Sequence, residues 1–247
     1  MSGILYKLGF FSRTLRGTIR LFRTEASRKI LTLQILFTFV QALGLASLLA
    51  VGIGAAVNAI GIPFLARLSQ EKLIYTLLIM IITRELGPLL GAFITISRSA
   101  TAIATEMAGM VISHEVEAYI AVGVDPIEHL ATPRFLGVTI SMFLLNIYFS
   151  IFGLAGSFLV AQLFNTMPPA IYFANLLEAL TWQDLLVSVI KSVVFGAIIS
   201  MVAIIQGLSV ERASTEVPVA GLRAVGLAFG GCVIADLLLS AVYYMVQ

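Results

Sequence analysis

Residues 84 to 134 read RELGPLLGAFITISRSATAIATEMAGMVISHEVEAYIAVGVDPIEHLATPR, and the interpretation of the chain starts from this segment. It begins with a charged pair, Arg84 and Glu85, inside an apolar run, and it ends in a polar loop rich in acidic residues. Charged side chains at membrane depth are costly, and they indicate a functional site by default. A polar loop between two apolar runs must face water or a partner protein. These two features organise the interpretation of the whole chain.

The composition is typical of a membrane protein. Hydrophobic residues make up 60% of the 247 residues and charged residues only 11%, whereas a soluble domain is about 25% charged. The apolar runs are too long for strands that alternate between lipid and lumen, which argues against a membrane β-barrel. Because backbone groups in lipid must be hydrogen-bonded within their own segment, helices remain. We predict an all-α integral membrane protein with a single domain over residues 1–247.

Five apolar runs provide the roughly 20 residues that a helix needs to cross a bilayer. They cover residues 31–62, 73–105, 135–163, 185–207 and 218–245. Ahead of them, residues 1–29 place basic and apolar side chains on different sides of a helix, which predicts an amphipathic helix in the headgroup layer. A disordered basic tail is the alternative. Seven Lys and Arg residues precede residue 30, and they predict a cytoplasmic N-terminus.

This orientation places the polar loop at residues 106–134 in the cytoplasm and, after five crossings, the C-terminus outside. A short helix is expected near residues 114–122 of the loop. Gly123 would end it, and Asp125 with Pro126 would form a turn. Lys191 lies near the outer end of the fourth run, where its side chain is expected to snorkel toward the headgroups.

A small and polar stripe follows one face of the second run. Its members are three or four residues apart and therefore line up on a helix: Arg84, Gly87, Gly91, Thr95, Arg98 and Ala102. We expect this stripe to face other helices or a cavity, and we expect Pro88 to kink the helix. Glu85 lies about 100° around the helix from Arg84, so the two need not pair with each other.

The charges in the spans admit two interpretations. Arg84, Glu85, Arg223 and Asp236 could pair between helices and fix their packing. They could instead form a polar patch in a lipid-sized cavity, where arginine binds phosphate through paired hydrogen bonds. Arg98 lies closer to the cytoplasmic end of its span, where it is expected to snorkel or to pair within the loop.

The sequence offers no catalytic machinery and no metal site. No lysine has the glycine spacing of a P-loop, so any ATP hydrolysis belongs to another chain. His114 and Glu115 begin a zinc-peptidase motif, but Ala118 stands where the second histidine belongs. Asp236 is the only aspartate inside a predicted span, which argues against a pair of catalytic aspartates. No nucleic-acid partner and no cofactor bound by this chain are expected.

Four motifs resemble the MlaE-type permeases: RELGP at residues 84–88, EMAGM at 106–110, GVDP at 123–126 and PRF at 133–135. The resemblance covers nearly the whole chain in the same order. It implies the membrane subunit of an ABC transporter in the bacterial inner membrane, moving phospholipids or related lipids between that membrane and an MCE-type periplasmic carrier. It also implies a homodimer, a cytoplasmic ABC ATPase that holds ATP and Mg, an MCE-domain partner and, in many systems, a STAS-domain protein.

The resemblance also implies which residues carry the function. A coupling helix seated in the ATPase would include His114, Glu115, Glu117, Gly123, Asp125 and Pro126. The lipid cavity would include Arg84, Glu85, Gly87, Gly91, Arg223 and Asp236. Residues 97–102 depart from a glycine-rich motif of the family, and the family's glycines and threonines around Arg223 are absent, so the chain looks like a divergent member.

The resulting hypothesis is lipid transport driven by ATP hydrolysis in a partner chain. The rival from another class is a membrane anchor that transports nothing and recruits cytoplasmic proteins through the same acidic loop. A secondary transporter ranks third, because the sequence shows no internal repeat of the kind that many such transporters have.

Overall fold

The computed structural model describes residue 14 and residues 25–69, 73–164, 168–211 and 213–246. All regular secondary structure within these ranges is helical. Five of the helices are long and apolar enough to cross a membrane: Arg28–Arg67, Leu73–Ile112, Ile127–Leu163, Trp182–Leu208 and Glu216–Met245. The prediction of an all-α membrane protein with five spans is confirmed. The amphipathic helix predicted for residues 1–29 lies almost entirely outside the described residues.

The spanning helices are assembled from shorter segments. The first joins α2 (Glu25–Thr38), the 3-10 turn η2 (Val40–Ala42) and α3 (Leu43–Arg67), and the second joins α4 (Leu73–Leu78), η3 (Ile79–Leu86), α5 (Gly87–Thr95), η4 (Ile96–Ala100) and α6 (Thr101–Ile112). The later elements are α7 (Glu115–Ala121), η5 (Ile127–Ala131), α8 (Thr132–Phe164), α9 (Pro169–Ala179), α10 (Trp182–Leu208) and α11 (Glu216–Val246). Each spanning helix contains the apolar run predicted for it and extends beyond that run.

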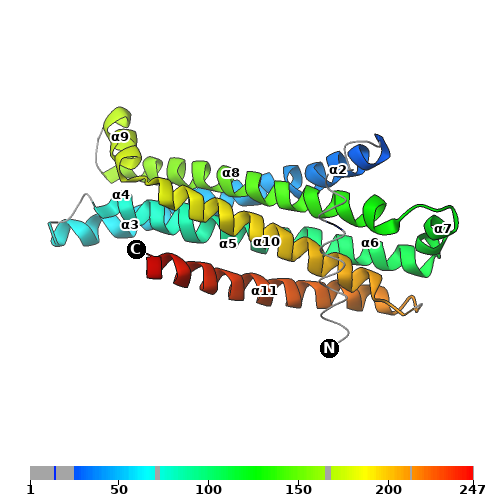
Figure 1. Ribbon diagram of the computed structural model, residues 1–247. Helices are drawn as coiled ribbons and strands as arrows, with labels where there is room; N and C mark the ends of the chain where they lie inside the picture. Colours follow the sequence, from blue (N-terminus) through cyan, green and yellow to red (C-terminus); the bar gives the residue numbers. More distant parts are fainter. Residues whose placement is uncertain (1–13, 15–24, 70–72, 165–167, 212, 247) are drawn as a thin grey trace.

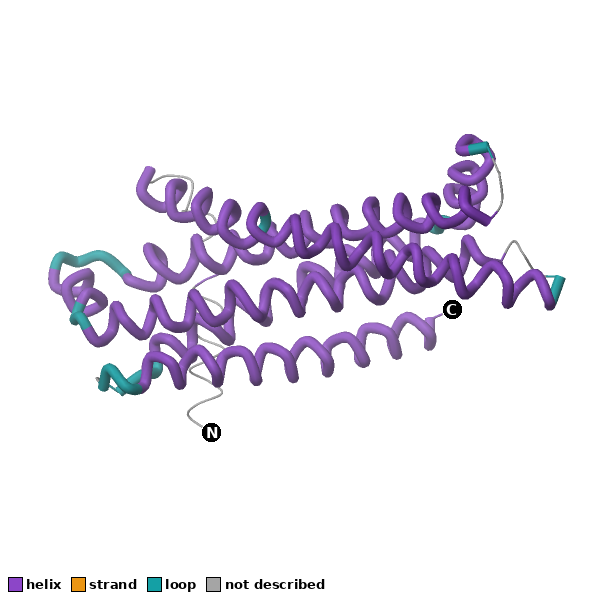
Figure 2. The backbone as a smooth tube through the Cα atoms, turned by 180° about the vertical axis from the view of Figure 1, so that it is seen from behind, coloured by secondary structure: helices purple, strands orange, loops and turns teal. Residues whose placement is uncertain are grey.

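The long helices lie side by side along one common direction (Figures 1 and 2). Helix α7 lies at one end of this bundle, and α9 lies at the other end with the last residues of α11. We call these the α7 end and the α9 end. Helix α8 packs against α2, α3 and α10, and α10 packs against α6 and α11. Helix α11 lies at the edge of the bundle and is the least buried of the five spanning helices.

Glycines allow α3 and α8 to approach closely. A Cβ atom added to Gly54 would overlap the backbone oxygen of Gly153, and one added to Gly156 would lie 2.6 Å from the Cα atom of Val51. Lipid tails are as apolar as leucine, so helices in a membrane associate through this kind of close packing rather than through a hydrophobic drive. The α3–α8 contact is therefore a rigid part of the bundle.

Two π-helical segments, η3 and η4, interrupt the second spanning helix on either side of α5. A proline lacks a backbone N–H, and its ring clashes with the carbonyl four residues earlier. Pro88 stands in the first turn of α5, directly after η3, so the wider turn accommodates it. The kink expected at Pro88 itself stays a prediction. Since π-helical turns often occur at functional sites, the position of Arg84 and Glu85 within η3 is notable.

A buried polar network fastens α9 to the spanning helices. The hydroxyl of Tyr172 on α9 shares a 2.7 Å hydrogen bond with the Ser157 hydroxyl on α8. The side-chain amide of Asn58 on α3 donates a 2.5 Å hydrogen bond to the carbonyl of Ser157. Burial raises the pKa of Tyr172 to about 12, against a smaller lowering effect of its bond with Ser157. The hydrogen bond between the Tyr172 and Ser157 hydroxyls holds α9 at its end of the bundle.

Candidate functional site

A buried lysine lies at the centre of the polar residues inside the bundle. The side chain of Lys191 on α10 has an exposed fraction of 0%. Its Nζ atom lies 2.5 Å from Oε2 of Glu85, 2.9 Å from Oδ1 of Asp236 and 2.8 Å from Oγ of Ser240. These partners come from η3 and from α11, so one ammonium group joins three helices.

The expectation that Lys191 snorkels is wrong. Helix α10 begins at Trp182, and nine residues at 1.5 Å each place Lys191 about 14 Å along the helix. The side chain points into the bundle, where it is fully buried. A lysine at this depth is stable because the carboxylates of Glu85 and Asp236 balance its charge.

Arg84 on η3 is another buried cation, and 7% of its side chain is exposed. Its Nε atom lies 3.3 Å from Oε1 of Glu85, and its Nη1 atom lies 3.4 Å from Oδ1 of Asp184. Its Nη2 atom donates a 2.7 Å hydrogen bond to the Tyr244 hydroxyl, and the guanidinium carbon lies 4.8 Å from the centroid of the Tyr243 ring. Groups of the protein from three helices therefore surround the guanidinium.

Glu85 connects the two cations. Its Oε1 atom faces Arg84, and its Oε2 atom faces Lys191. Helical spacing alone did not require Arg84 and Glu85 to pair, but the structure pairs them. Both side chains turn toward α10, where Asp184 and Lys191 supply the opposite charges. We call Arg84, Glu85, Asp184, Lys191 and Asp236 the charge cluster.

Asp184 is a member of the charge cluster that the sequence interpretation missed. It forms a capping box with Thr181 at the start of α10, in which Thr181 Oγ1 donates a 2.6 Å hydrogen bond to Asp184 Oδ2. The pattern of a threonine followed three residues later by an acidic residue could have indicated the helix start. Nothing in the pattern indicates the second contact of Asp184, with Arg84, because the two residues are 100 positions apart.

The two glycines predicted for the cavity lie in a helix contact. A Cβ atom added to Gly87 would lie 2.8 Å from Oδ1 of Asn146, and one added to Gly91 would lie 3.4 Å from Cε of Met142. Both partners belong to α8. Thr95 continues this contact, because its hydroxyl lies 3.4 Å from the Met142 sulfur. The small stripe on the second span therefore faces α8 along this part of its length.

Arg223 and Arg98 lie apart from the charge cluster. Arg223 is an exposed residue of α11, and it precedes Asp236 by 13 positions, which is about 20 Å along a helix. Arg98 donates a 2.9 Å hydrogen bond to the Gln41 carbonyl on η2. The structure thus brings Arg84, Glu85 and Asp236 together and leaves Arg223 nearer the α7 end.

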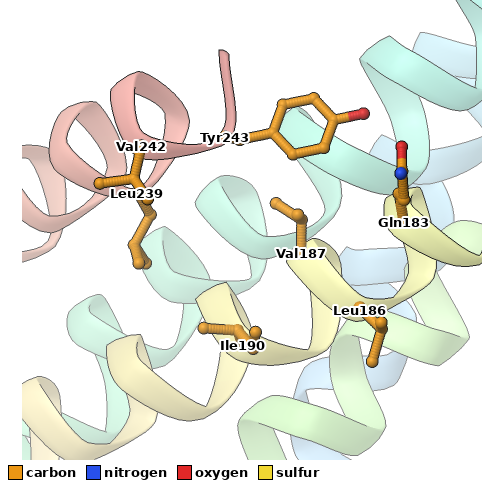
Figure 3. A pocket seen from close by; sticks show the side chains of 7 residues that line it. All are labelled: Gln183, Leu186, Val187, Ile190, Leu239, Val242 and Tyr243. Atoms are coloured by element: carbon orange, nitrogen blue, oxygen red, sulfur yellow. The ribbon is translucent and has the colours of Figure 1, made fainter. Parts of the chain in front are cut away.

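An apolar groove lies between α10 and α11 beside the charge cluster (Figure 3). Its volume is about 270 Å³, and it is lined by Gln183, Leu186, Val187, Ile190, Leu239, Val242 and Tyr243. The polar side chains of Gln183 and Tyr243 belong to the end of the groove that is nearer the α9 end. Tyr243 also contacts Arg84, so the groove and the charge cluster share a wall.

The short helix predicted near residues 114–122 of the polar loop is present as α7. His114 precedes it in the left-handed backbone conformation with φ of 60°, and His114 Nδ1 lies 2.9 Å from Oε2 of Glu117. Gly123 follows it with φ of 77°, a conformation that glycine adopts readily at the end of a helix. The side chain of Asp125 then accepts a 2.9 Å hydrogen bond from the backbone N–H of Ile127. This hydrogen bond stabilises the turn around Pro126.

Helix α7 is not buried against the rest of the chain. None of its residues is buried, and it carries Glu115 and Glu117 in its first turn. Ile120 and Val122 are exposed by 62% and 74%. Exposed apolar side chains beside carboxylates are typical of a surface that binds another protein.

A protein-family model matches the part of the chain that contains the charge cluster and α7. The family model described as Permease MlaE matches residues 31–242, a range that holds the charge cluster and α7. The chain belongs to the MlaE permease family. The family resemblance inferred from the RELGP and GVDP motifs is thereby confirmed. In this MlaE-family permease the RELGP motif supplies Arg84 and Glu85 to the charge cluster and Gly87 and Pro88 to the start of α5.

Relatives of this MlaE-family permease come from bacteria and from a plant. An intermembrane phospholipid transport system permease protein MlaE of Haemophilus influenzae is 27% identical over 75% of this chain and 72% of its own length. The chloroplastic protein trigalactosyldiacylglycerol 1 of Arabidopsis thaliana is 28% identical over 83% of this chain. A probable ABC transporter permease protein of Rickettsia typhi is 32% identical over 58% of this chain. The matched regions span 58% of the Arabidopsis protein and 55% of the Rickettsia protein.

Proposed function

We propose that this chain is the membrane subunit of an ATP-driven ABC transporter that moves phospholipids or related lipids between the inner membrane and an MCE-type periplasmic carrier. The observation that carries the proposal is the family match over residues 31–242. The relative from Haemophilus influenzae is named for intermembrane phospholipid transport. An apolar groove at a buried charge cluster, within membrane-spanning helices, supports a lipid as the cargo.

In this proposal α7 is the coupling helix. It would seat in a cytoplasmic ABC ATPase, with Glu115, Glu117 and the exposed Ile120 as its contacts. ATP and Mg would bind to that ATPase, and this chain would bind no cofactor. The N-terminus would be cytoplasmic and the C-terminus periplasmic, so the α9 end would face the MCE-domain partner. A STAS-domain protein would join on the cytoplasmic side in some systems.

A second copy of the chain would cover the open face of α11. That face carries large apolar side chains over most of its length: Leu222, Leu227, Phe229, Ile234, Leu237 and Leu238. The helix is the least buried span, and glycines and alanines on it favour close helix approach. A homodimer across α11 would place two charge clusters and two grooves around one axis.

The lipid headgroup would lie at the α9 end, near Arg84 and Glu85. The Arg84 guanidinium contacts Glu85, Asp184 and Tyr244 in this structure, so phosphate would have to displace one of these partners. The groove volume of about 270 Å³ is just below the 300–1,000 Å³ that is typical of small-molecule pockets. In this state the groove would accommodate part of a lipid rather than a whole one.

Affinity purification of the tagged chain from its native membrane tests the proposal. We expect an ABC ATPase to co-purify, and we expect native mass spectrometry to detect phospholipid on the complex. If cytoplasmic proteins other than an ATPase co-purify and the chain carries no lipid, the membrane-anchor hypothesis replaces this one.

A further inference from the structure

We propose that Tyr119 of α7 transmits the motion of a partner ATPase to the spanning helices, by pressing its ring against His129 where the chain re-enters the bundle. This role rests on the proposed ATP-driven transport and adds to it a path from α7 to α8. The contacts that define the role join α7, η5 and α8 and involve no residue of α11, so a homodimer across α11 is compatible with it.

Tyr119 joins α7 to the apolar core. No residue of α7 is buried, and Ile120, the residue after Tyr119, is exposed by 62%. The Tyr119 side chain is half-buried and packs against the core that α6, α8 and α10 share, together with Met110 of α6 and Ile127 of η5. Consecutive residues of a helix point about 100° apart. Helix α7 can therefore contact a partner with one face while Tyr119 contacts the bundle.

A ring contact joins α7 to the next segment of the chain. The centroids of the Tyr119 and His129 rings lie 5.3 Å apart, with the ring planes tilted by 47°. The Tyr119 carbonyl also accepts a 2.9 Å hydrogen bond from the backbone N–H of Val124. Residues 122–125, which connect α7 to Pro126, are exposed, so this connection has no packing to stiffen it. The ring contact therefore provides a packed route from α7 to η5.

His129 lies at the boundary where the chain becomes buried. His129 is half-buried, whereas residues 130–135 are all buried. The Arg134 guanidinium donates a 2.9 Å hydrogen bond to the Leu130 carbonyl through Nη1, and its Nη2 atom lies 2.7 Å from Oε1 of Glu106 on α6. These bonds fasten η5, α8 and α6 to one another, and closely packed interiors transmit strain. A displacement of His129 therefore moves the start of α8 and not a single side chain.

The backbone before α7 provides a pivot. His114 adopts the left-handed conformation with φ of 60° and separates α7 from α6, which ends at Ile112. Hinges are commonly a few residues at the ends of elements that absorb changes in backbone angles. Tyr119 lies five residues beyond His114, which is about 8 Å along a helix. A rotation of α7 about His114 would therefore swing the Tyr119 ring toward His129 or away from it.

Helix α8 extends the path to the charge cluster. The side-chain amide of Asn146 on α8 donates a 2.8 Å hydrogen bond to the Ser188 hydroxyl on α10. That hydroxyl donates a 2.7 Å hydrogen bond to the carbonyl of Thr83, the residue before Arg84. Packed elements and hydrogen bonds of this kind carry coupling between distant sites. A shift of α8 would therefore reach the helices that hold Arg84 and Lys191.

Replacing the Tyr119 ring separates transmission from docking. We expect Tyr119→Ala to keep the ATPase in the purified complex and to lower the number of lipids transferred per ATP hydrolysed severalfold, because the ring contact is lost. Tyr119→Phe is the matched control, since it keeps the ring, and it should behave as the wild type does. An unchanged ratio for Tyr119→Ala would overturn the role of Tyr119. Loss of the ATPase from a folded Tyr119→Ala chain would also overturn it, by assigning the residue to docking.

His129→Ala tests the same contact from the other side. It leaves α7 unchanged, so it decides the matter if size-exclusion chromatography shows that the Tyr119→Ala chain is misfolded. We expect the same loss of lipids transferred per ATP, and no further loss in the double variant, since both substitutions remove one contact. Losses that multiply in the double variant would contradict a shared contact. A wild-type complex that transfers no lipid would contradict the transport proposal itself, whereas wild-type transfer with unaffected variants contradicts the Tyr119 role alone.

Discussion

The Nζ atom of Lys191 lies 2.9 Å from Oδ1 of Asp236, so an ion pair joins α10 to α11 inside the membrane-spanning region. The same ammonium lies 2.5 Å from Glu85 of the second span. One fully buried lysine therefore sets the relative positions of three helices, and its removal leaves two carboxylates without their shared partner.

Lys191→Met should destabilise the protein by about 3–5 kcal/mol, the usual cost of removing one partner of a buried ion pair. Unfolding in detergent by chemical denaturant gives the measurement. The double variant Lys191→Met with Asp236→Leu should lose less than the sum of the two single losses, with a coupling of about 0.5–3 kcal/mol. Additive losses would show that the 2.9 Å contact has no energetic importance.

Tyr244→Phe removes one acceptor from Arg84 and leaves the aromatic ring in place. Hydrogen bonds to charged groups contribute about 1.5–3 kcal/mol, so we expect a loss of stability in that range. Tyr148→Phe is the control, because Tyr148 packs on aromatic neighbours away from the charge cluster. If both variants are equally stable, the 2.7 Å contact between Arg84 and Tyr244 does not hold α11.

Gly156→Ala should destabilise the α3–α8 contact. The new methyl group would meet the Val51 backbone at 2.6 Å, and overpacking of this kind costs about 1–3 kcal/mol. Gly52→Ala is the matched control on α3, because a Cβ atom there has nothing within 4 Å. It should be neutral or stabilising by up to about 1 kcal/mol, since alanine favours the helix interior. If thermal unfolding shows the same loss of stability for both variants, the close packing described between α3 and α8 is contradicted.

Charge reversal on α7 should uncouple the ATPase. Glu115→Lys with Glu117→Lys is expected to lower the ATPase activity of the purified complex, because both carboxylates lie on the exposed helix that would contact the partner. Glu211→Lys, a single charge reversal in the exposed loop between α10 and α11, should have little effect. An ATPase rate that ignores the double reversal would remove α7 from the coupling role.

The contact of Tyr172 that holds α9 against α8 should weaken in strong base. The pKa of Tyr172 is about 12 in the folded protein because burial raises it, against about 10 for an unfolded tyrosine. Between these two values the unfolded state has lost a proton that the folded state keeps, so stability falls as the pH rises from about 10 to about 12. Tyr172→Phe should abolish this part of the pH dependence in unfolding experiments. An unchanged slope would contradict the assignment.

The five spans and the α7 helix followed from simple sequence signals. Apolar runs of sufficient length predicted the spanning helices, and Gly123 with the Asp125–Pro126 turn predicted where α7 ends. These signals are local: they depend on a residue and its near neighbours, so one sequence suffices to read them.

The charge cluster could be predicted only in part. Arg84, Glu85 and Asp236 stood out because charges are rare in apolar runs. Lys191 was expected to snorkel to the membrane surface and Asp184 was not singled out, because pairing across 100 positions leaves no local pattern. Arg223 illustrates the opposite error, since a charge in the same helix as Asp236 was grouped with it although about 20 Å of helix separates the two.

ATP-driven lipid transfer in proteoliposomes is the measurement that would show whether this chain transports lipid. The assembled complex of this chain and its co-purifying ATPase would be reconstituted with a fluorescent phospholipid, and transfer to acceptor vesicles or to the periplasmic carrier would be followed over time. We predict transfer that requires ATP hydrolysis. Transfer rates that are the same with ATP, without ATP and in protein-free vesicles would contradict it.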